Sequence, residues 1–276
     1  MARVQPPITA ELTCAASDGV EVRATVTGNG PPLILLAGGI DYLGRGWQSA
    51  VAHLAEQRRV VRFVRRFYRP ELGDPFRWGM RDEARDVAAL ATALGGGVEL
   101  LGHSSGGVLA LECLVADPEL YRAAVVFEAP INDPAATGGE ALVRARRQLD
   151  AGRRVRAMVT FHADVVGMPS AASWLGSLLL AAVPEYRRRI PGQLADLAAI
   201  DALGDRRAAY GTITRPVLGV YGTTSPPHLP RRMRAMLDVL PNGRPCQVDG
   251  GHAAQANDPE GFARWVLAFL DERGPD

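Results

Sequence analysis

The chain has 276 residues, of which 47% are hydrophobic and 22% charged, and its formal net charge is +1. This is the composition of an ordinary globular protein that is long enough to bury a sizeable core. The small net charge, with basic residues scattered along the chain, gives no electrostatic basis for binding nucleic acid or an anionic membrane, so both classes of partner are excluded.

The cellular compartment is predicted from the cysteines and the first residues. Cys14, Cys113 and Cys246 are odd in number and far apart, which argues against a disulfide framework and for a reducing environment. The first residues lack the apolar core of a signal peptide, and no run reaches the roughly 18 apolar residues of a membrane span. We therefore expect a cytoplasmic protein.

The use of arginine for all 31 basic residues is typical of a GC-rich bacterium.

Predicted strands and helices alternate through the N-terminal half. Short alternating runs around the turn at 17–19 predict a β-hairpin over 11–26, and the apolar run LILLA predicts a buried strand over 33–37. The further elements are a helix at 46–57, a strand at 59–67, a polar loop at 68–79, a helix at 81–94, a strand at 98–101, a helix starting at 105 and a strand at 123–127. This alternation predicts a doubly wound, mostly parallel sheet.

The alternation stops after residue 130. Residues 133–211 have helical periodicity only, interrupted by glycine and proline, and predict four helices that form a lid. The strand and helix patterns then resume, with a strand at 216–221, a helix at 230–240, a strand at 246–248 and a closing helix at 262–270. We therefore predict an α/β core at 1–132 and 212–276, with a helical cap at 133–211 inserted after the sixth strand.

The most informative stretch is 98–116, because it joins a predicted strand to a predicted helix through the segment GHSSG at 102–106. A strand that turns directly into a helix forces the residue at the turn into a strained backbone conformation, and the residues two before and two after it must be nearly free of side chain. Gly102 and Gly106 meet this requirement around Ser104. The helix N-terminus also favours negative charge that develops beside it. Ser104 is therefore the predicted nucleophile.

A nucleophilic serine needs a base, and His252 is the best candidate among the five histidines. It lies directly after the last predicted strand and before the last helix, where a loop can reach the carboxyl edge of the sheet. The other four histidines are placed less well: His53 within a helix, His103 inside the GHSSG segment, His162 in the lid and His228 in a proline-rich turn.

The strand LILLAGG, the segment GHSSGG and the segment GGH at 250–252 together resemble an α/β-hydrolase with a helical cap, over nearly the whole chain. More narrowly, the chain resembles small bacterial hydrolases in which GHSSG is followed by a strand ending in a Tyr-Glu-Pro-Pro-like motif, here FEAP at 127–130. The resemblance implies the α/β-hydrolase fold and a triad in the order Ser104, Glu128 and His252. Haloalkane dehalogenases and epoxide hydrolases of this fold use an aspartate nucleophile, so a serine implies acyl transfer instead.

The acid of the implied triad has three candidates. In most members of the fold it is an aspartate in a Gly-x-x-Asp-like turn after the strand that follows the cap, but here that turn reads GTTSP at 222–226 and offers only Ser225. Glu128 ends the preceding strand, where relatives such as haloalkane dehalogenases place the acid, and a carboxylate stabilises an imidazolium better than a hydroxyl does. We therefore favour Glu128 over Ser225, and over Asp249, which lies only three residues from His252.

The resemblance also implies an oxyanion hole formed by the backbone N–H groups of Ser105 and Gly39. Family members usually have His-Gly in the loop that carries Gly39, whereas this chain has AGG at 37–39. Because the donors are backbone groups, this change does not by itself abolish the hole. What braces the loop in place of the histidine is left open. Asp41 and Tyr42 follow this loop and are further candidates for facing a substrate.

Three lid residues, Phe161, His162 and Trp174, are the predicted contacts to an apolar acyl or ring group of the substrate. Their helical spacing also allows the alternative that they pack the lid onto the sheet. The arginine-rich runs at 144–147 and 187–189 are predicted to be solvated helix faces.

We expect a serine hydrolase without cofactor or metal that cleaves an ester, lactone or thioester of a small, apolar molecule through an acyl-enzyme on Ser104. One alternative keeps the fold and the base but acts as a non-hydrolytic cyclase or lyase of bacterial secondary metabolism. Another is a non-catalytic ligand receptor, since one fold supports many functions. The sequence specifies neither the substrate nor the oligomeric state, and a homodimer is an open alternative.

Overall fold

The computed structural model describes residues 10–39, 41, 44–133 and 135–272. The chain divides into two compact units. The sheet unit contains Met1–Val64, Arg81–Pro130 and Arg207–Asp276, and the helical unit contains Arg65–Met80 and Ile131–Arg206.

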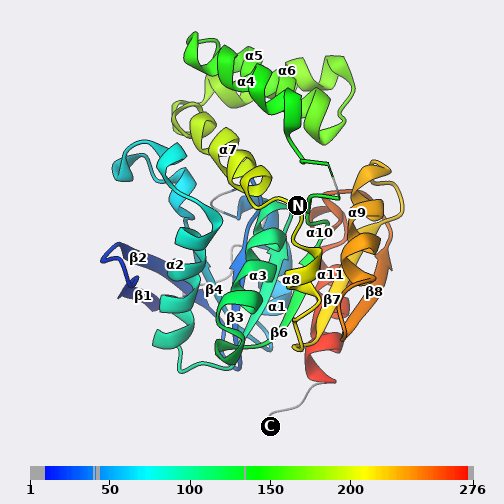
Figure 1. Cartoon of the computed structure of the whole chain (residues 1–276). Coiled ribbons are helices and arrows are strands. Elements are labelled where there is room, and N and C mark those ends of the chain that lie inside the picture. The colour runs from blue at the N-terminus through cyan, green and yellow to red at the C-terminus, as the bar shows by residue number, and fades with distance from the viewer. Residues whose placement is uncertain (1–9, 40, 42–43, 134, 273–276) are drawn as a thin grey trace. The chain divides into compact units, whose positions relative to one another are not determined.

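An eight-stranded sheet forms the centre of the sheet unit (Figure 1). Its strands are β1 (Ala10–Ala15), β2 (Glu21–Thr27), β3 (Pro32–Leu36), β4 (Arg59–Phe63), β5 (Val98–His103), β6 (Tyr121–Phe127), β7 (Val217–Gly222) and β8 (Gly243–Val248). Their order across the sheet is β1-β2-β4-β3-β5-β6-β7-β8. The pairs β1–β2 and β2–β4 are antiparallel, whereas the pairs from β4–β3 to β7–β8 are parallel. The predicted doubly wound, mostly parallel sheet is confirmed.

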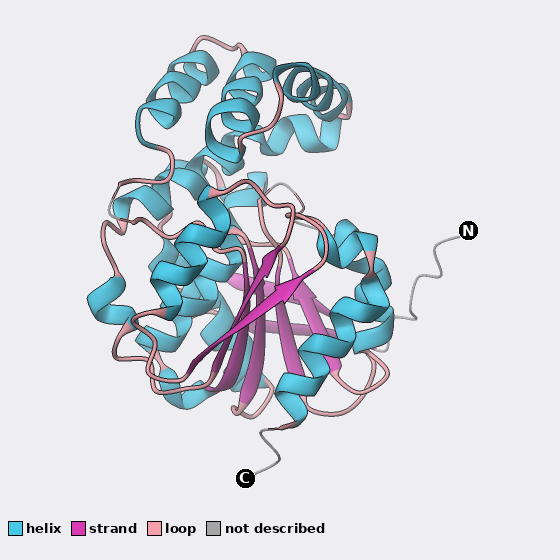
Figure 2. Ribbon diagram, turned by 90° about the vertical axis from the view of Figure 1, so that its right-hand side faces the viewer, coloured by secondary structure: helices cyan, strands magenta, loops and turns pink. Residues whose placement is uncertain are grey.

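Helices cover both faces of this sheet (Figure 2). They are α1 (Gln48–Leu54), α2 (Met80–Ala93), α3 (Ser105–Ala116), α8 (Arg207–Tyr210), α9 (His228–Leu237), α10 (Ala254–Asn257) and α11 (Pro259–Asp271). Helices α1 and α11 pack together on one face, where Trp47, Leu101, Phe127 and Phe262 belong to one buried apolar cluster. Because the central strands are covered on both faces, they consist of nearly continuous apolar residues. The core therefore fixes the strands whose carboxyl ends carry the candidate site.

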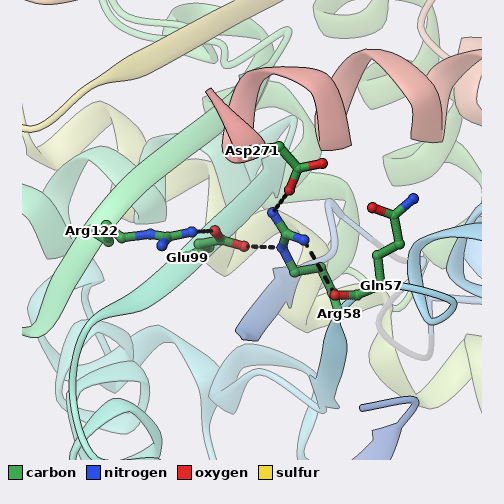
Figure 3. Close-up of polar contacts among 5 residues, drawn as sticks. All are labelled: Gln57, Arg58, Glu99, Arg122 and Asp271. Carbon is green, nitrogen blue, oxygen red and sulfur yellow. Dashed lines mark hydrogen bonds and ion pairs between the residues drawn. The ribbon is translucent and has the colours of Figure 1, made fainter. Parts of the chain in front are cut away.

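A buried ion-pair network joins the start of β5 to its neighbours (Figure 3). Glu99 is fully buried and accepts hydrogen bonds from Arg58 Nε at 2.7 Å and from Arg122 of β6. Arg58 also donates to Asp271, at the end of α11, at 2.7 Å. Burial alone would lower the pKa of Arg58, but its hydrogen bonds to Asp271 and Glu99 outweigh burial and raise that pKa. The Glu99 and Asp271 carboxylates therefore compensate the charge of the buried Arg58 guanidinium.

The helical unit contains α4 (Gly139–Asp150), α5 (Arg154–Thr160), the π-helix η6 (Phe161–Val166), α6 (Ser170–Ala182) and α7 (Pro184–Ala202). It also includes three short 3-10 helices, η2 (Arg66–Tyr68), η3 (Pro70–Leu72) and η4 (Pro75–Arg77). The buried Arg65 guanidinium binds both carboxylate oxygens of Asp196 on α7, at 3.1 and 2.8 Å, and the Tyr68 hydroxyl donates to the same carboxylate at 2.7 Å. These contacts attach residues 65–80 to α7.

Several element boundaries differ from the prediction. Strand β4 ends at Phe63, four residues earlier than the predicted 67, because the following Arg65 turns into its ion pair with Asp196. The predicted helix at 46–57 is shorter, with the 3-10 helix η1 (Arg45–Trp47) before α1. Within the described ranges, every helix is too short or too polar to cross a membrane.

Candidate active site

The loops that carry the predicted site residues of the sheet unit leave one edge of the sheet. Strands β3, β5, β6, β7 and β8 run parallel, so their carboxyl ends meet at this edge. In an open α/β sheet, this edge is where ligands bind. The residues that directly follow these strands are Ala37, Ser104, Glu128, Thr223 and Asp249.

Ser104 occupies a strained turn between β5 and α3. Its backbone φ is 53° and its ψ is −125°, a conformation that residues with side chains rarely adopt. A side chain at position 106 would collide with the carbonyl oxygen of Leu36, and one at position 102 would collide with that of Gly106. The Ser104 N–H donates to the Phe127 carbonyl at 2.8 Å, which attaches the turn to the end of β6. This geometry explains the glycine spacing of the GHSSG segment.

Glu128 and His252 form a close pair at the same edge. The His252 Nδ1 atom lies 2.6 Å from Glu128 Oε2, and the Gly222 N–H donates to the other carboxylate oxygen at 2.8 Å. The Glu128 side chain is fully buried, whereas 30% of the His252 side chain is exposed. Glu128 also has a positive φ, of 48°. Among the described non-glycine residues, only Ser104 and Glu128 share this feature, which marks both as places where the fold imposes strain.

The environment keeps Glu128 ionised. Burial alone would raise the pKa of this carboxyl, but the hydrogen bonds with His252 and with the Gly222 N–H outweigh burial and lower it. A buried, ionised carboxylate beside Nδ1 of an imidazole holds a proton on that nitrogen and leaves Nε2 free to accept one. Glu128 is therefore suited to orienting His252 as a base.

The predicted oxyanion loop closely approaches the serine turn. A side chain at Gly38 would lie 2.7 Å from the Ser104 Cβ atom, so only glycine fits at this position. The Gly39 N–H donates to the Ser105 hydroxyl at 3.1 Å. Ser105 begins α3 and is buried. The structure thus brings Gly39 and Ser105 together, and the Ser105 hydroxyl holds a loop in which this chain lacks the usual family histidine.

His103 connects the serine turn to the loop that carries His252. Its Nε2 atom lies 3.0 Å from the His252 carbonyl oxygen, and the two imidazole rings are 4.6 Å apart. The His103 ring also stacks on Phe127 at 4.8 Å and meets the edge of Trp47 at 5.6 Å. Burial, together with the neighbouring His252, lowers the pKa of His103 well below 6.5, so this ring stays neutral.

The structure also describes three other candidates, Asp41, Asp249 and Ser225, whose roles stay predictions. The Asp41 carboxylate accepts the Gly46 N–H, within η1, at 3.1 Å. Burial raises the pKa of Asp41 to about 6, although the Gly46 N–H opposes this rise. Asp249 is exposed, and Ser225 lies close to Gly222, next to the Glu128 carboxylate. Tyr42 lies outside the described residues.

The three predicted lid contacts belong to the helical unit. Phe161 packs against a small apolar cluster with Ala157 and Leu194. His162 Nδ1 lies 2.9 Å from the Ser177 hydroxyl, and burial lowers the pKa of His162. Trp174 lies on the exposed face of α6. Their role as substrate contacts stays a prediction.

Sequence reasoning missed two contributors to this edge. The Gly222 N–H and the His103 imidazole each hold one member of the Glu128–His252 pair, across sequence separations of 94 and 149 residues. Only the position of His103 at the carboxyl end of a buried strand, one residue before the serine, could have indicated it. In the part of the chain that the structure describes, no group of three histidine, cysteine or acidic side chains is arranged to hold a metal ion.

Comparisons with known proteins agree with this architecture. Residues 33–265 match the model of the Alpha/beta hydrolase family. A putative carbamate hydrolase, RutD, from Pseudomonas savastanoi pv. phaseolicola is 26% identical over 249 residues, which cover 87% of this chain and 94% of that protein.

Two solved structures share the fold at low identity. An alpha/beta hydrolase from Sphaerobacter thermophilus has a TM-score of 0.75 at 23% identity, covering 94% of this chain and 100% of the other. The esterase RhEst1 from Rhodococcus sp. ECU1013 has a TM-score of 0.72 at 24% identity, covering 96% and 100%. Because the family model matches most of this chain, the chain belongs to the alpha/beta hydrolase family and is an enzyme.

Proposed function

We propose that the protein is a serine hydrolase that cleaves a small-molecule ester, lactone or thioester through an acyl-enzyme on Ser104. The observation that carries the proposal is the 2.6 Å contact between His252 Nδ1 and the buried Glu128 carboxylate, at the sheet edge that also carries a serine in a strained turn. A serine hydroxyl is a weak nucleophile until an oriented base removes its proton. The Glu128–His252 pair is such an oriented base.

In the proposed reaction, the Ser104 hydroxyl attacks the substrate carbonyl carbon while His252 Nε2 takes the hydroxyl proton. The resulting imidazolium is stabilised by Glu128 and then protonates the leaving group, so that an acyl group remains on Ser104. Water, deprotonated by the same histidine, cleaves the acyl-enzyme and regenerates the serine. Glu128 stays ionised throughout, as the lowered pKa of its carboxyl favours.

The proposed oxyanion hole consists of the backbone N–H groups of Gly39 and Ser105. Such donors stabilise the negative oxygen of the tetrahedral intermediate because they are fixed before the reaction starts. Since the Gly39 N–H donates to the Ser105 hydroxyl at 3.1 Å, a substrate oxygen that uses this donor must share it with the hydroxyl or displace it. The site therefore favours carbonyl oxygens that gain substantial negative charge.

The substrate class is a carbonyl compound with a leaving group. The names of relatives add carbamates to the classes worth testing, because the similar protein from Pseudomonas savastanoi is named a putative carbamate hydrolase. The Rhodococcus structure is named an esterase, which agrees with an ester substrate. Phe161, His162 and Trp174 remain candidates for contacts to the apolar part of the substrate.

Labelling with a fluorophosphonate probe tests the proposal. Intact-protein mass spectrometry followed by peptide mapping should find one adduct, on Ser104, in the wild-type protein. The adduct should disappear in Ser104→Ala and decrease strongly in His252→Ala, whereas His53→Ala, a change on α1, should label like wild type. An unlabelled, folded wild-type protein contradicts the proposal, and turnover that survives Ser104→Ala favours the cyclase or lyase alternative.

A further inference from the structure

His103 is a buried, titratable side chain that the proposed reaction does not use. Its ring packs against both Phe127 and His252, with centroid distances of 4.8 and 4.6 Å. Phenylalanine or leucine would fill such a space without burying a polar group. In the described part of the chain, the His103 Nδ1 atom is buried without a hydrogen-bond partner. Burial of an unpaired acceptor is unfavourable, so the imidazole must be retained for what its other nitrogen does.

The direction of the other hydrogen bond follows from its acceptor. The His252 carbonyl oxygen can only accept, so His103 Nε2, 3.0 Å away, must carry the proton and donate it. This assigns His103 to the neutral tautomer protonated on Nε2. In this tautomer the buried Nδ1 atom carries no proton. A neutral ring is also required here, because a charged His103 would repel the imidazolium that forms on His252 during the proposed reaction.

We propose that His103 is a positioning residue that holds the backbone of the base loop, so that His252 is fixed at both its carbonyl group and its ring. The ring is held by Glu128, which contacts Nδ1 at 2.6 Å, and the carbonyl is held by His103. With the ring alone fixed, the main chain of the loop could shift and tilt Nε2 away from the serine. This inference rests on the proposed function, in which His252 is the base.

The position of His103 in the chain suits this role. Because it directly precedes Ser104, its hydrogen bond ties the base loop to the same turn that carries the nucleophile. A displacement of about 1 Å between reacting groups lowers the rate about 100-fold. Loss of the contact that couples the base loop to the serine turn should therefore lower the rate strongly. The effect should fall on kcat, since His103 has no contact with the substrate in this scheme.

Three substitutions separate positioning from packing. His103→Gln places an amide donor as many bonds from Cα as Nε2 and can restore the hydrogen bond. His103→Asn places the same donor one bond shorter, at the distance of Nδ1, and cannot. His103→Phe keeps an aromatic ring without a donor. His53→Phe on α1 is the matched control, because it makes the same replacement at a partly exposed histidine whose Nδ1 lies 3.6 Å from Glu56.

The first readout is hydrolysis of p-nitrophenyl butyrate, with thermal unfolding as the check of folding. We expect kcat to fall about 100-fold in His103→Phe and His103→Asn with KM within about 2-fold, and His103→Gln to stay within about 5-fold of wild type. Equal rates in all variants, or an equal loss in His103→Gln and His103→Asn, overturns the inference. If His103→Phe fails to fold, the comparison of glutamine with asparagine carries the same test.

The second readout does not depend on turnover. Proton NMR should show the His252 Nδ1–H, hydrogen bonded to Glu128, as a downfield resonance that persists in His103→Gln and broadens or shifts in His103→Asn. An unchanged resonance in both variants overturns the inference. Failure of the proposed function has a different signature, because the wild-type protein would then show no fluorophosphonate adduct on Ser104.

Discussion

Replacement of Glu128 by glutamine tests the proposed triad most directly, because the structure dictates how the new amide must lie. The Gly222 N–H donates at 2.8 Å to the carboxylate oxygen that does not face His252. In Glu128→Gln this donor requires the amide oxygen, so the NH₂ group must point at His252 Nδ1. A donor at that position forces the imidazole to carry its proton on Nε2. His252 then donates toward the serine and cannot accept its proton.

The expected magnitude is large. In a serine hydrolase, a change that stabilises the wrong histidine tautomer lowers kcat about 10⁴-fold, which corresponds to about 5.5 kcal/mol of transition-state stabilisation. Glu128→Asp keeps the charge but withdraws it by one methylene from a 2.6 Å contact, and we expect about a 100-fold loss. The order of rates should therefore be wild type, then aspartate, then glutamine.

The assay combines the rate of fluorophosphonate labelling with ¹⁵N NMR of selectively labelled histidine. Labelling should slow in the order given above, and the His252 spectrum should change from the Nδ1-protonated to the Nε2-protonated pattern in Glu128→Gln. Thermal unfolding identifies any loss of folded protein. A glutamine variant that labels within about 10-fold of wild type, with the His252 tautomer changed as expected, would refute the assignment of Nε2 as the proton acceptor.

Three further predictions concern stability, each measured by urea unfolding. Glu99→Ala should lower the free energy of unfolding by about 3–5 kcal/mol, because the buried Arg58 guanidinium loses the carboxylate that faces it. Glu119→Ala, which breaks a surface pair, should lower it by less than about 1 kcal/mol. Because the pKa of His103 is lowered in the folded state, the unfolded chain takes up a proton below about pH 6.5 that the native chain excludes. As the pH falls from about 7.5 to about 5, wild type should therefore lose more of its free energy of unfolding than His103→Gln does, and equal losses would contradict this. Gly106→Ala should cost about 3 kcal/mol or more, whereas Gly176→Ala, with open space around the new methyl group in α6, should be neutral or stabilising.

The sheet and the serine turn could be predicted because they depend on local patterns. The apolar runs of β3, β5 and β6 reflect strands that are covered on both faces, where a polar residue needs a buried partner, as Glu99 has in Arg58. The glycines of the GHSSG segment reflect steric collisions within a few residues of Ser104. Each of these constraints acts along a short stretch of chain, so the sequence alone records it.

The contacts between distant segments could not be predicted in the same way. Glu128 accepts the Gly222 N–H, and any residue other than proline offers such a donor, so no side-chain pattern marks the position. Likewise, nothing in the sequence distinguishes Arg65 from the neighbouring arginines. It is Arg65 that pairs with Asp196, 131 residues later, and β4 ends just before this pair, at Phe63. The exact boundaries of β4 and the role of His103 depend on such long-range partners.

The assembly of the helical unit from two separate pieces of chain matters for anyone who exchanges parts between members of the family. A chimera that replaces only residues 133–211 would remove Asp196 and leave Arg65 and Tyr68 facing a foreign helix without the carboxylate that they share. A buried guanidinium that loses its carboxylate is strongly destabilising. A graft that transfers residues 65–80 together with 131–206 would keep both halves of this contact, and the exchangeable module is therefore discontinuous in sequence.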